Sequence, residues 1–431
     1  MKPGTDRRAG ATARSHGRRR RGAGLVAATL GVWAVALTGL APAAAADDVQ
    51  SQQWYLDAMS ADQLWNVSTG KDITVAVIDS GVSETKSLEG KVLPGKDVTG
   101  TSGGPTDDYD GHGTSMAELI AGSGKDGSLK GLAPDAKVVP YRVTLTTLPG
   151  KHKDDTYKAI REAADGDARI INMSIGGQYW DPQEESAIKY ALSKGKLLFA
   201  SVGNESSSKT EYPASYRGVV GVSAADENGT VAKFSEYNDS VDLASPGADV
   251  PSWCDKTLKR YCKSEGTSQA SAIASASAAL IWSAHPDWTA NQVLRVLIDT
   301  AGRDWPKDSP SKYLGYGLIR PARNLLHHEG DPGPADVDPI TGEKTPGVAS
   351  SSGTSAAGSA SQDPDGKASG DASSAGKDSS QGTSGGETSA AAATADSSDG
   401  NGTLWTVVAA VAAVVVVGGG IFAFVRKRRT A

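Results

Sequence analysis

The 431-residue sequence has little cysteine and a low share of apolar side chains. Two cysteines are too few for a disulfide-rich scaffold or for a four-cysteine zinc site. Apolar residues make up 38% of the chain, against roughly 45–50% in ordinary globular domains. The chain also holds 51 glycines and 20 prolines. This composition indicates that part of the chain is not packed into a core.

Basic side chains are scarce outside the two ends of the chain. Residues 1–46 hold eight lysines and arginines, and residues 426–431 hold four. Residues 47–425 carry 32 basic and 49 acidic side chains, a net charge of −17. A surface this acidic repels the phosphate backbone of nucleic acids, so we expect no nucleic-acid partner.

Residues 1–46 have the three parts of a secretory signal peptide. An arginine-rich start is followed by the apolar stretch 23–40 and by the alanine-rich segment 41–46. We therefore expect export, with cleavage after Ala46. The alternative is a disordered basic arm, which would leave the apolar stretch exposed without a reason.

At the other end, residues 404–425 contain no charged side chain. A helix of this length spans about 33 Å, enough for a bilayer core of about 30 Å. Four cations follow at 426–429, which places the tail 426–431 in the cytoplasm by the positive-inside rule. These features predict a single-pass type I protein of the cell membrane whose other domains lie outside. The alternative is a buried core helix.

Residues 329–403 are mostly Ser, Gly, Ala, Thr and Asp. Such a segment cannot bury enough apolar surface to offset its chain entropy. We expect a disordered stalk that holds a folded domain away from the membrane.

The remaining residues 73–328 alternate apolar runs of strand length with segments of helical spacing. Continuous apolar strands between helices indicate a parallel sheet covered on both faces, and therefore an α/β fold. Asp181 is the expected N-cap of one helix. The expected strands are 73–78, 136–143, 169–173, 196–202 and 219–223, and the expected helices are 154–164 and 182–194. Active sites of such sheets lie at the carboxyl ends of the strands.

Two polar residues mark that edge of the sheet in the first half of the domain. Asp79 ends the first strand, where it can orient a histidine or simply cap a turn. His112 lies between two glycines, which let other groups approach closely, and it enters a helical segment. Either residue alone is weak evidence of a catalytic site.

Two more candidates follow in the second half. Ser268 opens a helix rich in Ala and Ser, where free backbone N–H groups and the helix dipole favour an oxyanion. Asn204 closes the strand 196–202 and offers an amide N–H at the same edge. The alternatives are a plain N-cap for Ser268 and a turn residue for Asn204.

Taken together, these segments resemble the signatures of the subtilisin-like serine proteases (subtilases, peptidase family S8). Asp79 is followed by Ser80-Gly81, His112 lies in Gly-His-Gly-Thr, and Ser268 ends Gly-Thr-Ser. The chain order Asp, His, Ser is the one that the subtilisins use. The entry segments 53–56, 61–65 and 68–70, with the stalk and anchor, are most similar to the membrane-anchored mycosins associated with type VII secretion.

The resemblance implies a three-layer subtilisin-like fold and a serine endopeptidase that acts through an acyl-enzyme. Ser268 would be the nucleophile, His112 the general base and Asp79 its positioning carboxylate, with Asn204 in the oxyanion hole. It also implies a substrate-binding strand and a pocket for the residue before the cut, formed by Ser174, Ile175, Gly176, Ala200, Ser201, Val202 and Gly203. Residues 47–72 are too short for a separate pro-domain, so we expect this N-terminal extension to pack on the protease domain 73–328.

Several residues near the candidate site differ from the family pattern or suggest further bonds. Ala272, Ser115 and Glu118 depart from the residues common in the family. In an exported protein we expect a disulfide between Cys254 and Cys262, with free thiols as the alternative. Three acids at 107, 108 and 110 could hold a structural calcium ion or form a solvated turn. We expect no other cofactor and no catalytic metal.

Two functions remain open. The chain can be an active endopeptidase that cleaves secreted or envelope polypeptides. It can instead brace a secretion complex, with proteolysis secondary and with type VII components as partners. An adhesin with a dead protease fold would need a broken triad, and this sequence carries all three residues.

Overall fold

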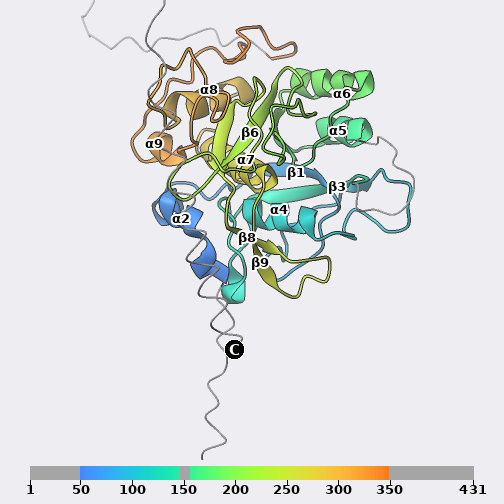
Figure 1. The fold of residues 1–431 in the computed structure, drawn as a ribbon. Coiled ribbons are helices and arrows are strands. Elements are labelled where there is room, and N and C mark those ends of the chain that lie inside the picture. Colours follow the sequence, from blue (N-terminus) through green and yellow to red (C-terminus); the bar gives the residue numbers. More distant parts are fainter. Residues whose placement is uncertain (1–48, 146–155, 349–431) are drawn as a thin grey trace, which may run out of the picture. The chain divides into compact units, whose positions relative to one another are not determined.

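The computed structural model describes residues 49–145 and 156–348, and its centre is a seven-stranded sheet (Figure 1). Every paired strand in this sheet is parallel, in the order β2-β3-β1-β4-β5-β6-β7. The strands are β1 (Thr74–Asp79), β2 (Lys96–Asp97), β3 (Lys137–Arg142), β4 (Ile170–Met173), β5 (Leu197–Ser201), β6 (Val219–Ala225) and β7 (Leu243–Pro246). All five predicted strands are confirmed. The sequence pattern missed β2, which has two residues, and β7, whose four residues include a serine and a proline.

Helices cover both faces of the sheet, which confirms the predicted three-layer α/β arrangement (Figure 1). Along β1, Val75 and Val77 pack into the core on one face, while Ala76 and Ile78 pack into the core on the other. The first core includes residues of α4, α7 and α8, and the second includes residues of α5 and α6. The helices are α4 (His112–Ala121), α5 (Thr156–Asp165), α6 (Pro182–Ser193), α7 (Thr267–Ala284), α8 (Ala290–Thr300) and α9 (Pro321–Leu325).

Local sequence explains where two of these helices begin and how one of them continues. Asp181 caps α6 by accepting a hydrogen bond from the Gln183 N–H at 2.8 Å, and Pro182 occupies the first turn, as predicted. Helix α7 begins after Gly266 and continues unbroken through Ala272. Its small Ala and Ser side chains allow nearly the whole helix to lie buried in the core. The nucleophile candidate is therefore carried by a rigid central element.

The N-terminal extension packs on the domain, as expected. It contains the 3-10 helix η1 (Val49–Gln52) and the short helices α2 (Trp54–Ala58) and α3 (Ala61–Leu64). The side chains of Tyr55 and Leu64 are fully buried. Gln53 exchanges hydrogen bonds with the backbone of Lys130, and the Trp54 indole donates to the carbonyl of Ala248.

Residues 329–348 also pack on the domain, so the predicted start of the disordered stalk at residue 329 is wrong. The Arg295 guanidinium donates to the carbonyls of Pro332 and Pro334, and the Asn291 amide donates to the carbonyl of Ala335. These donors on α8 hold a segment that has few apolar side chains of its own. Composition alone could not reveal this, because the partners lie on another element.

Several predictions concern segments outside the described residues. These are the signal peptide 1–46, the remainder of the stalk, the membrane helix 404–425 and the tail 426–431. Within residues 49–145 and 156–348, no helix is both long enough and apolar enough to cross a bilayer.

Candidate active site

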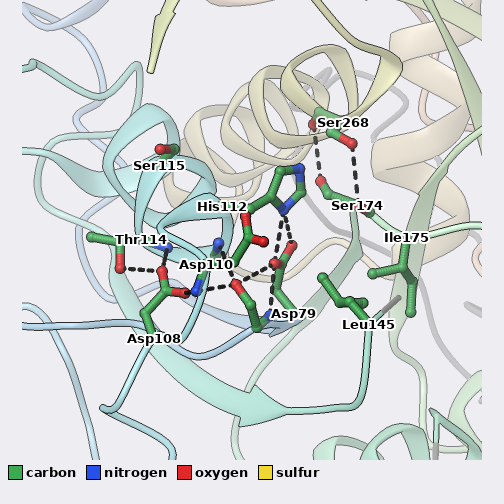
Figure 2. Close-up of polar contacts among 12 residues, drawn as sticks. Asp79, Asp108, Asp110, His112, Thr114, Ser115, Leu145, Ser174, Ile175 and Ser268 are labelled. Atoms are coloured by element: carbon green, nitrogen blue, oxygen red, sulfur yellow. Dashed lines mark hydrogen bonds and ion pairs between the residues drawn. The ribbon is translucent and has the colours of Figure 1, made fainter. Parts of the chain in front are cut away.

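Asp79 and His112 meet at the carboxyl edge of the sheet (Figure 2). Asp79 is the last residue of β1 and is fully buried. His112 is the first residue of α4, after Gly111, whose φ of +95° is in the left-handed region that favours glycine. The His112 Nδ1 lies 2.8 Å from Oδ1 of Asp79 and 3.0 Å from Oδ2. The carboxylate therefore fixes the orientation of the imidazole.

A second acid, Asp108, organises the turn that delivers His112. Its two oxygens accept hydrogen bonds from the backbone N–H groups of Asp110, Gly111 and Thr114 at 2.8–3.0 Å. They also accept from the hydroxyls of Thr114 at 2.6 Å and Ser80 at 2.8 Å. Sequence reasoning assigned Asp108 to a cation site or a solvated turn. The solvated turn is wrong for this residue, which is buried and saturated with protein donors.

The electrostatics of the site favour a charged imidazole. Burial lowers the pKa of His112, but the negative charge of Asp79 and its hydrogen bond outweigh burial, with smaller contributions from Asp110 and Asp108. The net effect raises the pKa of His112 from 6.5 to about 9. The site thus stabilises the imidazolium, the form that a general base becomes when it accepts a proton.

Ser268 lies in the first turn of α7, on the other side of the His112 ring from Asp79 (Figure 2). Its hydroxyl donates to the carbonyl oxygen of Ser174 at 3.2 Å, and the Ser174 hydroxyl donates to the carbonyl of Ser268 at 2.9 Å. Among the described contacts, the Ser268 hydroxyl thus bonds to Ser174 and not to His112. Rotation about the Cα–Cβ bond of Ser268 would redirect this hydroxyl.

Asn204 lies next to the same helix start. Its side-chain oxygen accepts from the Thr267 N–H at 2.8 Å and from the Thr267 hydroxyl at 3.0 Å. Asn204 is otherwise exposed, so its NH₂ group is directed away from these two donors. An amide oriented in this way can donate to an oxyanion near the helix N-terminus.

The structure also brings together the two predicted substrate-binding segments. Strands β4 and β5 are neighbours, with Met173 paired to Ala200. Beyond this pair, the Ser201 hydroxyl donates to the Ile175 carbonyl at 3.2 Å, and the Gly203 N–H donates to the Thr267 hydroxyl at 3.2 Å. Gly176 is exposed, while Ala200, Ser201 and Val202 are buried. The two segments thus lie beside the residue that precedes Ser268.

Sequence reasoning missed a buried residue behind Ser268. Asn172 on β4 accepts hydrogen bonds from Ser271 and Ser275 of α7 at 2.9 and 3.1 Å, and its amide donates to Ser174 at 3.0 Å. These bonds join the sheet to the helix that carries Ser268. The alternation of serine and alanine in α7 indicates that buried hydroxyls need hydrogen-bond partners. It does not indicate that Asn172 is the partner.

The expected disulfide between Cys254 and Cys262 is present, at the end of the antiparallel hairpin of β8 (Val250–Trp253) and β9 (Tyr261–Ser264). This hairpin packs on α4: the Ser115 hydroxyl accepts from the Trp253 N–H at 2.9 Å, and Glu118 accepts from the Tyr261 hydroxyl at 2.9 Å. Two of the residues that depart from the family pattern therefore bind the hairpin. Burial raises the pKa of Glu118 to about 7.

Among the described residues, no three His, Cys, Asp or Glu side chains form a group that could hold a metal ion. The three acids before His112 instead belong to the turn around Asp108.

Comparison with known proteins places this geometry in a family. The model of the subtilase family (peptidase S8) matches residues 70–317, more than half of the chain. The chain is 33% identical over 248 residues to the major intracellular serine protease of Bacillus subtilis strain 168, covering 54% of this chain and 76% of the relative. It is 36% identical over 223 residues to the thermophilic serine proteinase of Bacillus sp. strain AK1, covering 51% of this chain and 55% of that relative. The chain thus spans about half the length of the Bacillus sp. strain AK1 proteinase. The chain belongs to the subtilase family and is a subtilisin-like serine endopeptidase.

Solved structures give the same fold. The MycP3 protease from the type VII (ESX-3) secretion system superposes with a TM-score of 0.55 at 30% identity, covering 63% of this chain and 88% of that one. MycP1 from Mycobacterium smegmatis gives a TM-score of 0.59 at 25% identity, covering 65% and 86%. A protease from Pseudoalteromonas arctica is similar as well, with a TM-score of 0.57 at 26% identity, covering 65% of this chain and 98% of that one. The fold is therefore shared with mycosins and with other subtilases.

Proposed function

We propose that the chain hydrolyses peptide bonds with Ser268 as nucleophile, His112 as general base and Asp79 as the carboxylate that positions it. The observation that carries the assignment is the 2.8 Å bond between His112 and Asp79, formed at the carboxyl edge of the sheet close to the start of α7. Membership of the subtilase family supports it.

In the proposed reaction, the Ser268 hydroxyl first rotates from Ser174 toward His112. The serine oxygen attacks the scissile carbonyl carbon while its proton passes to Nε2 of His112. The Asn204 amide and the Ser268 N–H donate to the resulting oxyanion. Collapse of the tetrahedral intermediate breaks the C–N bond, and the amine leaves with the proton from His112. Water then hydrolyses the acyl-enzyme by the same steps.

The substrate in this proposal is a polypeptide in an extended conformation. Residues 174–176 follow β4 and offer backbone groups for pairing with an added strand. Ser174 also holds the resting Ser268 hydroxyl, so substrate binding and release of the nucleophile involve the same segment.

We further propose that the enzyme is anchored in the cell membrane by residues 404–425 and acts outside the cell in connection with type VII secretion. The sequence features of the two ends support the location. The likeness to MycP3 and MycP1 supports the secretion link, because these proteins belong to type VII systems.

A fluorophosphonate probe tests the catalytic proposal, because it labels only an activated serine. Full-length protein in membranes should be labelled, the Ser268→Ala variant should not, and the Ser283→Ala variant should keep the label. Ser283 lies near the far end of α7, where its hydroxyl donates to the Lys71 carbonyl. A folded parent that takes no label would contradict the assignment of Ser268.

The second candidate function is a bracing subunit of a secretion complex. It is supported by the likeness to MycP1, which is described as a serine protease and an essential component of the ESX-1 system. Chromosomal Ser268→Ala and deletion strains separate the two roles. Loss of secretion in both strains favours proteolysis, and loss in the deletion strain alone favours bracing.

A further inference from the structure

Two glutamates, Glu211 and Glu236, lie against the glycines of the proposed substrate pocket. A methyl group built on Gly176 would lie 3.1 Å from Oε2 of Glu211. A methyl group built on Gly203 would lie 2.8 Å from Oε2 of Glu236 and 3.0 Å from Cγ of Glu211. Glu236 therefore lies against Gly203, and Glu211 lies against both Gly176 and Gly203.

The backbone fixes both glutamates to these segments. Beside Glu211, Tyr212 and Gly177 exchange backbone hydrogen bonds at 2.8 and 2.9 Å. The Glu236 N–H donates to the carbonyl of Gly203 at 3.1 Å. Since the Gly203 N–H bonds to Thr267, both acids belong to the framework that also holds the nucleophile candidate.

Both carboxylates are buried, and that of Glu236 lacks a full set of hydrogen-bond donors. Glu236 is 0% exposed and Glu211 is 8% exposed. The Ser207 hydroxyl donates to Oε1 of Glu236 at 2.8 Å, but no described residue donates to its Oε2. A buried carboxylate oxygen without a donor is costly.

The charges around this pair do not neutralise it. Burial raises the pKa of both groups, and the charge of Glu236 raises that of Glu211 further, against a smaller lowering by the neutral Gln178 amide. Lys209 has a smaller opposite effect on both, but its ammonium pairs with Glu205 at 2.9 Å. Within the described residues, no lysine or arginine forms an ion pair with either pocket glutamate. The described residues thus leave both carboxyl groups without an ion-pair partner, and a cation bound beside them would favour their charged form.

We propose that Glu211 and Glu236 select a lysine or arginine side chain as the residue immediately before the cleaved bond. The inference rests on the proposed function, because it assigns a substrate class to the same site. An ammonium supplies three hydrogen-bond donors and a guanidinium supplies five, and both bring the missing positive charge. A neutral side chain of the same length would leave both carboxylates without a cation, which is how a buried polar site rejects the wrong substrate.

Binding tests this selection without turnover. Full-length Ser268→Ala protein is titrated with two fluorescent peptides that differ only in arginine or citrulline at the position before the cut. Citrulline has nearly the shape of arginine and no charge. We expect at least tenfold tighter binding of the arginine peptide, measured by fluorescence anisotropy, and loss of this ratio when Glu236→Gln is added. Equal affinity for the two peptides overturns the proposal.

Turnover by the active protein gives an independent readout. The concentration of active sites in each preparation is first determined with the fluorophosphonate on a separate sample. On untreated protein, kcat/KM is then measured on the arginine and citrulline substrates for the parent, Glu211→Gln and Glu236→Gln. Each variant should lose about tenfold or more on arginine and less than twofold on citrulline. Glu162→Gln, which changes a half-buried residue of α5 that pairs with Lys96, should match the parent. An equal loss on both substrates would assign the glutamates a merely structural role.

The two experiments separate this inference from the function on which it rests. Absence of fluorophosphonate labelling contradicts the catalytic proposal, while the anisotropy ratio still decides the selection of a basic side chain. Labelling together with a preference for neutral side chains overturns the selection alone.

Discussion

The two acidic regions of the site differ in how their carboxylates are satisfied. On one side, Asp79 and Asp108 are buried among hydroxyls, backbone N–H groups and an imidazole that all bond to them. On the other, Glu236 is equally buried but keeps one oxygen without a described donor. The first pair is complete within the protein and positions other groups. The second is incomplete, and its missing donors are those of a cationic ligand.

The largest expected difference between the regions is in catalysis. Asp79→Asn removes the charge that orients His112 and stabilises the imidazolium, so kcat/KM should fall by about 10⁴. The loss should be the same for arginine and citrulline substrates, in contrast to that of Glu236→Gln. The control is Asp107→Asn, which changes an exposed acid next to Asp108 in the sequence. The activity of this variant should stay near that of the parent. A loss confined to basic substrates would erase the distinction between the two regions.

The pH dependence tests the Asp79 side alone. His112 must be neutral to accept a proton, and its pKa is raised to about 9. With a neutral substrate, kcat/KM should therefore fall about tenfold per unit as the pH decreases below 9, roughly 100-fold by pH 7. The midpoint should shift to lower pH in Asp79→Asn, where residual activity permits the measurement. A plateau that already extends down to pH 7 would show that Asp79 does not raise this pKa in the working enzyme.

The smallest expected effect is the contrast in stability between two isosteric changes. Asp108→Asn replaces an acceptor by an NH₂ group that meets other donors, so it should lower the free energy of unfolding by about 2–3 kcal/mol. Glu236→Gln removes a buried charge and loses no donor, so stability should stay equal or rise. Urea unfolding at pH 8 compares the two variants. Equal destabilisation would mean that Glu236 is as well satisfied as Asp108.

The sequence predicted those parts of the fold and site that depend on local pattern. The continuous apolar runs around Val75–Ile78 and Leu197–Ala200 identified buried parallel strands, and these strands bring the segments after them to one edge. Asp79 and His112 could be paired in advance because each is part of a distinctive short motif. Their distance, and the rotation of Ser268 toward Ser174, depend on packing that no local pattern specifies.

What the sequence could not predict are contacts between distant segments. Asp108 looked like one acid among three, and only the fold shows which of them faces Ser80 and Thr114. Glu211 and Glu236 lie in loops without a distinctive motif. The backbone pairing of Tyr212 with Gly177, and of Glu236 with Gly203, brings them to the pocket segments. Residues 329–348 have few apolar side chains, and hydrogen-bond donors on α8 hold them on the domain.

Several side chains of the N-terminal extension form hydrogen bonds with main-chain atoms of the protease domain. Gln50 donates to the carbonyls of Gly124 and Ser128, Gln53 bonds to both backbone groups of Lys130, and Trp54 donates to the carbonyl of Ala248. A surface recognised through its backbone is indifferent to the identity of its side chains but sensitive to its length. An exposed residue of this loop such as Lys125 can therefore change its side chain, although the buried Leu129 and the left-handed Gly124 cannot. A single inserted residue would instead shift the carbonyls out of register and release the start of the domain.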